Sequence, residues 1–241
     1  MDTASSAARL IEIVSGPPPA SIAEVLARMQ AIDALLTGGD GLKWFNLLYL
    51  RVTQKVDSSP ATGGWKDAAW LTRLDVVFAQ FYFTAILNWT TNPAGVPGSW
   101  KALFESRFRP GIERIQFALA GMNAHINHDL ALALLQTDAE LNLLPDKTSP
   151  EHDDFERVNG ILEAVLPEAL QFLATGVLGE LAQDTGKIGS LLAIWNVRAA
   201  RDLAWDFADH LHCLPVIARG AALAAQDQLT GTLGRSLLLA V

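Results

Sequence analysis

The chain has 241 residues, of which 50% are hydrophobic, and a formal net charge of −8. This length suits one large domain or two small ones and is enough to bury a sizeable core. The acidic balance, without any cluster of Lys and Arg, argues against nucleic acid, because neutralising phosphates needs grouped basic side chains. The single cysteine, Cys213, excludes an internal disulfide. Together with a start that lacks a signal-peptide pattern, it favours a cytoplasmic protein.

The most hydrophobic window of the chain, residues 68–89, is interrupted by polar and charged side chains, among them Arg73 and Asp75. A transmembrane helix needs about 20 residues with few or no charges. We therefore expect no membrane span.

Apolar residues recur at helical spacing along most of the chain, and turn-forming residues separate these stretches. No alternating run of apolar and polar residues demands a strand. We expect helices at about residues 4–15, 21–37, 42–56, 67–89, 100–108, 111–139, 150–167, 188–211 and, as one or two helices, 216–241. The sequence therefore predicts an all-α protein, a single-domain multi-helix bundle of about eight to ten helices.

Several helix ends carry recognisable capping residues. Ser21 begins a capping-box pattern, and Asp67 or a neighbour is expected to start the long fourth helix. Ser149 followed by Pro150 is a typical helix start, with the proline at the first helical position. We expect Pro167 to kink or end the helix that begins there.

One stretch of ten residues, GMNAHINHDL, gathers polar side chains inside an otherwise apolar run. His125, His128 and Asp129 stand at i, i+3 and i+4, so a helix places them on one face. Asn123 and Asn127 share the opposite face. Burying these groups is costly unless each finds a partner, so we predict that this stretch carries a functional site.

Imidazole and carboxylate groups are ligands that Zn, Fe and Mn accept. One helix supplies only two good ligands at this spacing, so acids from other helices must complete a metal shell. The prediction is a divalent metal (Zn, Fe, Mn or Mg) held by His125, His128, Asp129, Asp75 and Asp154. Two alternatives stay open. The histidines act as acid and base without a metal, or they belong to a structural hydrogen-bond network.

Aromatic and charged residues form a second cluster on the helix expected near the C-terminal end. Trp195, Arg198, Asp202 and Trp205 lie along one stripe at helical spacing, and Arg201 adjoins it. Arginine stacks on indole rings and binds carboxylates through two hydrogen bonds. The cluster would then clamp an anionic or carbonyl-bearing ligand. An ion pair that joins two helices is the structural alternative.

Together these residues predict a metal-dependent enzyme for a small, largely apolar substrate, acting by hydrolysis, or by elimination or cyclisation in secondary metabolism. The predicted catalytic residues are His125, His128, Asp129, Asp202, Arg198 and Arg201. The predicted substrate-binding residues are Trp195, Trp205, Tyr82, Phe155, Asn123, Asn127 and Asn159. One alternative is a bundle that binds a small molecule or heme without catalysis. Another is a structural scaffold with a buried polar network. The sequence leaves open whether the chain forms a homo-oligomer.

The GMNAHINHDL stretch resembles a family of uncharacterised, mostly actinobacterial helical proteins of unknown function. The likeness extends to residues 45–50, to Asp75 and its neighbours, to residues 154–159 and to residues 195–205. It implies a helical fold and no particular activity. Where the family often has Glu in an Arg-acid-x-Ala-Trp pattern, this chain has Asp202, whose shorter side chain would reach less far toward a metal.

Overall fold

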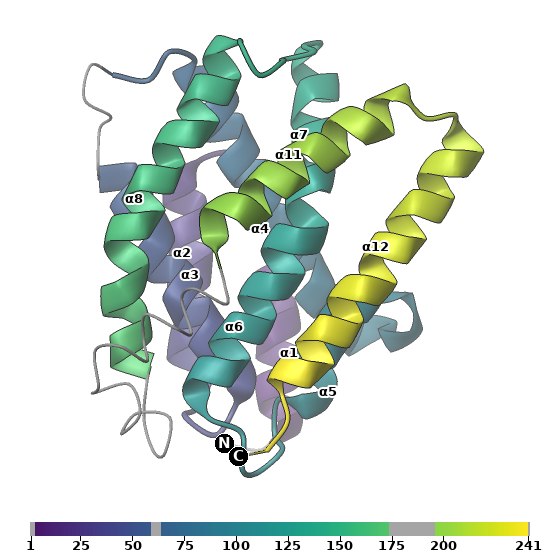
Figure 1. The fold of residues 1–241 in the computed structure, drawn as a ribbon. Helices are drawn as coiled ribbons and strands as arrows, with labels where there is room; N and C mark the ends of the chain where they lie inside the picture. Colours follow the sequence, from purple (N-terminus) through teal and green to yellow (C-terminus); the bar gives the residue numbers. More distant parts are fainter. Residues whose placement is uncertain (1–2, 59–63, 174–195, 241) are drawn as a thin grey trace.

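The computed structural model describes residues 3–58, 64–173 and 196–240, and every regular element within these ranges is helical (Figure 1). This confirms the predicted all-α multi-helix bundle. The α-helices are α1 (Thr3–Val14), α2 (Ile22–Leu35), α3 (Gly41–Ser58), α4 (Ala68–Thr91), α5 (Gly98–Ser106), α6 (Arg114–Ala124), α7 (Leu130–Leu141), α8 (Pro150–Leu173), α11 (Val197–Cys213) and α12 (Val216–Leu237). A 3-10 turn, η1 (Pro93–Gly95), precedes α5, and a π turn, η2 (His125–Asp129), joins α6 to α7.

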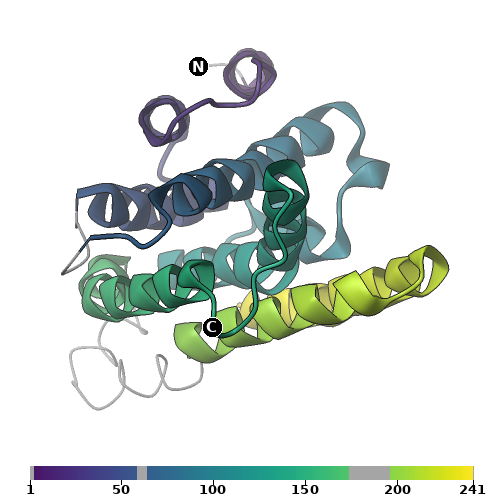
Figure 2. The same cartoon turned by 90° about the horizontal axis from the view of Figure 1, so that it is seen from above.

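The helices form layers that are clear from above (Figure 2). Helices α1 and α2 lie on one side of the molecule and α11 and α12 on the other, with α3 and α4 between them. Helix α3 packs against α2, α6 and α8, while α4 packs against α1 and α7. The α6–η2–α7 segment is therefore surrounded, and its side chains enclose much of the core. None of the described helices combines the length and apolar character that crossing a membrane requires.

Capping residues predicted from the sequence begin two of the long helices. Asp67 is the N-cap of α4, and its side chain accepts a hydrogen bond from the backbone N–H of Trp70 at 2.9 Å. The hydroxyl of Ser149 accepts from the N–H of His152 at 3.2 Å at the start of α8. Of the two outcomes expected at Pro167, a kink or a helix end, the end is wrong, because α8 continues through this residue to Leu173. Residues 188–195, where the next helix was expected to start, lie outside the described ranges.

The helix expected over residues 111–139 is divided in the structure. Its central part, His125–Asp129, is a π turn between two α-helices. Such turns are rare and occur often at functional sites. Gly121, one turn before His125, lies directly under the ring of Phe45 on α3. The glycine therefore provides the room for this ring beside the π turn.

Helix α12 is fastened to α5 and α6 by polar contacts and close backbone packing (Figure 1). The Asp227 carboxylate accepts hydrogen bonds from the N–H groups of Gly98 and Ser99, at 2.7 and 2.9 Å, at the start of α5. A Cβ atom at Gly231 would lie 2.7 Å from the carbonyl oxygen of Gly98. A larger residue would therefore force α12 and α5 apart.

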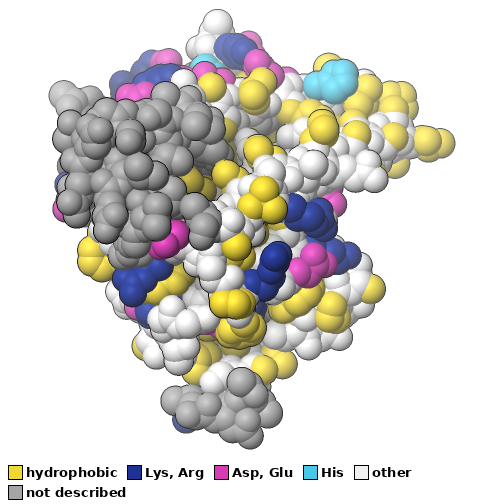
Figure 3. Space-filling view, turned by 60° about the horizontal axis from the view of Figure 1, so that its bottom comes forward, with side chains coloured by type: hydrophobic (Ala, Val, Ile, Leu, Met, Phe, Trp, Pro, Cys, Tyr) yellow, Lys and Arg dark blue, Asp and Glu magenta, His cyan; other side chains and the backbone are white. Residues whose placement is uncertain are grey.

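The outer surface mixes charges of both signs. Among the described residues on the face drawn in Figure 3, Lys and Arg side chains lie next to Asp and Glu side chains and apolar groups.

Candidate functional site

The carboxylate of Asp129 is the centre of a buried hydrogen-bond network. Its Oδ2 atom lies 2.9 Å from Nδ1 of His125 and accepts from the indole N–H of Trp100, also at 2.9 Å. Its Oδ1 atom lies 2.8 Å from Nδ1 of His128. Burial alone would raise the pKa of Asp129, but the hydrogen bonds from both histidines outweigh it and lower this pKa. An ionised carboxylate only accepts hydrogen bonds, so both imidazoles carry a proton on Nδ1.

The imidazole of His125 is held between aromatic rings with its second nitrogen unused. The ring of Phe78 stacks on it, with centroids 3.6 Å apart and an interplanar angle of 6°. Tyr49 meets it edge to face with centroids at 4.6 Å. Its Nε2 atom is buried and has no hydrogen-bond partner within the described part of the chain. Burial lowers the pKa of His125 despite the opposing effect of Asp129. The ring is therefore neutral at pH 7, with the lone pair on Nε2.

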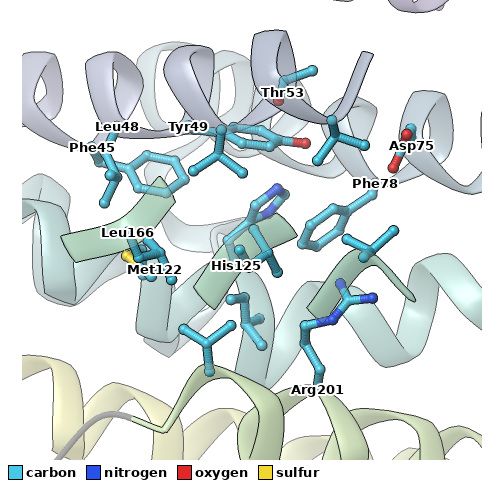
Figure 4. Close-up of a pocket in the computed structure, with 16 residues that line it drawn as sticks. Phe45, Leu48, Tyr49, Thr53, Asp75, Phe78, Met122, His125, Leu166 and Arg201 are labelled. Atoms are coloured by element: carbon cyan, nitrogen blue, oxygen red, sulfur yellow. The ribbon is translucent and has the colours of Figure 1, made fainter. Parts of the chain in front are cut away.

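This imidazole borders a cavity of about 80 Å³ between α3, α4, α6, α8 and α11 (Figure 4). Most of the lining is apolar and includes Phe45, Leu48, Phe78, Met122, Val158 and Leu162. A few polar side chains interrupt it, namely Tyr49, Thr53, Asp75, His125 and Arg201. An apolar cavity with a small number of converging polar groups is the usual form of a small-molecule site.

Two oppositely charged groups face the end of the cavity away from Met122, Asp75 from α4 and Arg201 from α11 (Figure 4). Burial raises the pKa of Asp75 to about 7, although the charge of Arg201 opposes this shift. The Arg201 side chain donates to Oδ1 of Asn159 at 2.6 Å and to the carbonyl oxygen of Phe155 at 2.9 Å. Burial lowers the pKa of Arg201 to about 10, so the guanidinium remains charged at neutral pH.

His128 points away from the cavity, toward α12. Its Nε2 atom lies 3.8 Å from Oδ1 of Asp227. Burial alone would lower the pKa of His128, but the hydrogen bond and charge of Asp129, together with the charge of Asp227, raise it. His128 does not line the cavity. It is connected to His125 through Asp129, whose carboxylate contacts both imidazoles.

Of the predicted catalytic residues, His125 and Arg201 reach the cavity, and Asp75 joins them there. Arg198 lies one turn before Arg201 but on a more exposed face, where it pairs with two glutamates of α8 at 2.9 and 2.8 Å. Burial and the neighbouring glutamate raise the pKa of Asp202, which does not line the cavity. The two arginines of the predicted clamp thus have different surroundings.

The two asparagines predicted to bind substrate connect helices instead. The side-chain N–H group of Asn127 donates to Oδ1 of Asn123 at 3.0 Å. Asn123 in turn donates to the carbonyl oxygen of Thr230 on α12 at 2.8 Å. Neither asparagine lines the cavity. These two amides therefore connect α6 and the π turn to α12.

The predicted aromatic wall lies mostly outside the lining of the cavity. The hydroxyl of Tyr82 donates to an asparagine of α3 at 3.2 Å within the core. Trp205 packs against Phe155 with ring centroids 5.0 Å apart, and Phe155 supports the guanidinium of Arg201 at 3.9 Å. Trp195 lies outside the described residues. Phe155 and Asn159 thus contact Arg201 and hold its guanidinium in place, and Arg201 in turn lines the cavity.

The predicted metal ligands are not assembled around one point. The carboxylate of Asp154 accepts the N–H groups of Lys66 and Asp67, at 3.0 and 2.7 Å, and so connects α8 to the start of α4. In the ranges that the structure describes, no group of three or more His, Cys, Asp or Glu side chains is arranged to hold a metal ion. Metal binding therefore stays a prediction.

Sequence reasoning did not assign a site role to Tyr49, Thr53, Phe78, Met122 or Trp100. The first two lie four residues apart on the predicted helix 42–56, which placed them on one face. Phe78 follows a predicted metal ligand by one helical turn. These spacings were visible signals. Nothing in the sequence pairs Trp100 with an acid on another helix.

Comparison with known proteins gives a family without an assigned activity. No curated protein and no solved structure matches the chain. A family described as a family of unknown function, DUF5995, matches residues 22–240 and so includes every residue of the cavity. The chain belongs to this family, DUF5995.

Proposed function

We propose that the chain is an enzyme that binds a small, largely apolar molecule in the cavity beside His125 and uses this histidine as a general base. The observation that carries the proposal is the buried Nε2 atom of His125, which has no partner within the described residues. Buried polar atoms are nearly always hydrogen-bonded, so an unpaired one beside a cavity favours a ligand as the missing partner.

The arrangement around His125 suits proton abstraction. Asp129 accepts from Nδ1 and so leaves the lone pair on Nε2, the nitrogen without a partner. When Nε2 takes a proton, the negative charge of Asp129 stabilises the imidazolium that forms. A histidine oriented by a carboxylate in this way is a common base in catalysis.

The proposed reaction is one in which a base removes a proton from a bound molecule or from a water beside it. Hydrolysis, elimination and cyclisation all contain such a step. The partly buried Asp75 has a pKa of about 7, so this residue supplies a proton donor at neutral pH. General acid–base catalysis of this kind contributes about 10²–10⁴ in rate.

The volume of the cavity limits the size of the molecule. At about 80 Å³, it is smaller than the roughly 150 Å³ of an engineered cavity that holds benzene. A ligand with a short chain of carbons fits the space as it stands. A larger one requires ring movements, most simply of Phe78, which is only partly buried.

Methyl NMR of methionine tests whether the cavity binds such molecules. Met122 lines the cavity, and Met29, fully buried between α2 and the core and absent from the cavity lining, is an internal control. Small apolar molecules should shift the Met122 methyl signal saturably and leave that of Met29 unchanged. If no compound in a broad set of short-chain molecules does so, the proposal fails.

Turnover of the compounds that bind tests the role of His125. In His125→Asn, the amide N–H group replaces Nδ1 as donor to Asp129, but nothing replaces Nε2. We expect turnover to fall by about 10² or more while binding at Met122 persists. Turnover that survives this substitution would show that another group is the base.

A further inference from the structure

The site has a buried cation, Arg201, whose hydrogen-bond partners are uncharged. We infer that the molecule bound in the cavity carries a carboxylate and that the guanidinium of Arg201 binds it. This inference rests on the proposed function, because it assigns the polar end of the same ligand. It also assigns different roles to the two arginines of α11, because Arg201 lines the cavity whereas Arg198 pairs with glutamates of α8.

Arg201 is 6% exposed and lines the cavity. Its Nε and Nη2 atoms donate to an amide oxygen and a backbone carbonyl, and Nη1 makes no hydrogen bond to the residues that the structure describes. Within that part of the chain, no carboxylate lies within ion-pair distance of 4.0 Å of this guanidinium, so the charge is buried without a paired anion. Buried charges are normally paired, because taking an ion out of water is costly.

The amide of Asn159 adds a second donor beside the guanidinium. Its Oδ1 atom accepts a hydrogen bond from Nε of Arg201, so the oxygen end of the amide faces the arginine. The Nδ2 atom of Asn159 is buried and lacks a partner among the described residues. This unpaired donor beside a charged guanidinium favours an acceptor with negative charge rather than a donor group.

The guanidinium is also held in one position before any ligand binds. It lies 3.9 Å above the ring of Phe155 and is bonded on two sides. A planar, fixed guanidinium binds carboxylates through two parallel hydrogen bonds and loses little entropy in doing so. His125 presents a lone pair and Asp75 an acid at the same cavity, so a carboxylate is better accommodated at Arg201 than at either.

The test compares molecules of one size that differ only at the polar end. Butanoate, butanamide and butan-1-ol are titrated into the full-length protein, and the Met122 methyl signal gives each dissociation constant. Hydrogen bonds to charged groups are stronger than neutral ones, so we expect butanoate to bind about tenfold or more tighter than butanamide. Equal binding of all three molecules would overturn the carboxylate inference and leave the proposed cavity standing. No binding by any of them would overturn both.

Variants of α11 provide the matched controls. Arg201→Gln should abolish the preference for butanoate, and Arg201→Lys, which keeps the charge, should retain part of it. Arg198→Gln removes an arginine one turn away that pairs with surface glutamates, and should leave all three dissociation constants unchanged. With a pKa of about 7, Asp75 is mostly ionised at pH 8, so Asp75→Asn should tighten butanoate severalfold at that pH by removing a competing negative charge. If Arg201→Gln does not fold, Arg201→Lys replaces it in the comparison. A preference for butanoate that is reduced in Arg201→Lys but complete in the unaltered protein and in Arg198→Gln supports the inference.

Discussion

Nδ1 of His125 lies 2.9 Å from Oδ2 of Asp129, and this contact decides which nitrogen of the imidazole is left for a ligand. The two residues are four apart in the π turn, so one segment provides both the base and the group that orients it. The other oxygen of Asp129 binds His128. The charge state of the network therefore links the cavity to the opposite side of the π turn, where α12 packs.

The two histidines should titrate on opposite sides of the ordinary value for histidine. Burial lowers the pKa of His125, whereas Asp129 and Asp227 raise that of His128 despite its burial. Nitrogen NMR of the imidazole side chains should therefore show His125 neutral at pH 7 with the proton on Nδ1, and His128 losing its second proton at a higher pH than an ordinary histidine. Asp129→Asn removes the stabilising charge from both rings, so both pKa values should fall. Histidines that titrate together near 6.5 would contradict this picture of the network.

Asp129→Asn should also destabilise the protein, since it removes the buried carboxylate that accepts hydrogen bonds from His125, His128 and Trp100. Breaking a buried pair by removing one partner costs about 3–5 kcal/mol. Urea unfolding at pH 6 should show a loss of this order. Asp206→Asn is the matched control, because its pair with Lys147 is exposed and screened by solvent and should contribute little.

The same pair sets a pH dependence whose sign follows from the two pKa shifts. The lowered pKa of Asp129 gives stability that is present above its unfolded value of 3.8 and lost as the pH falls through the folded value. The raised pKa of His128 gives stability that is present below 6.5 and lost as the pH rises through the folded value. The contribution of the pair should therefore be largest between about pH 4 and 6.5. The difference in unfolding free energy between the unaltered protein and Asp129→Asn should shrink on either side.

Asp75→Asn should stabilise the protein at alkaline pH and have little effect in acid. The folded pKa of Asp75 is about 7, well above its unfolded value of 3.8. Between these values the unfolded chain releases its proton first, so stability from this group falls as the pH rises. The asparagine variant lacks this penalty and should gain between about 1 and 4 kcal/mol at pH 8. Glu105→Gln, a change at an exposed acid of α5, is the control and should show no comparable gain.

Local chemistry made much of the fold predictable from the sequence. Asp67 and Ser149 cap helices because their side chains bond to backbone groups three residues ahead, which a sequence displays directly. Helical spacing likewise placed His125 and Asp129 on one face. A helix end at Pro167, one of the two outcomes expected there, was wrong because a proline inside a helix can be tolerated when the surrounding packing holds the chain.

The composition of the site was less predictable, because it depends on contacts between distant segments. Arg198 and Arg201 are equivalent in the sequence pattern, and only the packing of α8 places one beside surface glutamates and the other at the cavity. Trp100 joins Asp129 across 29 positions of the chain. The π turn at His125–Asp129 has no simple sequence signature. It also changes the number of residues per turn, so faces assigned from α-helical spacing do not hold across it.

Gly121→Ala should damage the cavity without touching any of its polar groups. A Cβ atom at this position would lie 2.6 Å from Cβ of Phe45 and would overlap the ring. The ring of Phe45 lines the cavity and meets His125 edge to face, with centroids at 5.8 Å. The methyl group would therefore displace the ring of Phe45, which contacts both the cavity and the imidazole. Overpacking of this kind costs about 1–3 kcal/mol, which urea unfolding should detect.

The matched control is Gly160→Ala on α8, where a Cβ atom would meet nothing within 4 Å. Because alanine favours the helix over glycine, this variant should be more stable by about 0.5–1 kcal/mol. In Gly121→Ala the aromatic shifts of His125 and the binding of short-chain molecules at Met122 should both change, while Gly160→Ala should leave them as they are. If Gly121→Ala were as stable as the unaltered protein and bound the same molecules, the close packing of α3 on the π turn would not be what shapes the cavity.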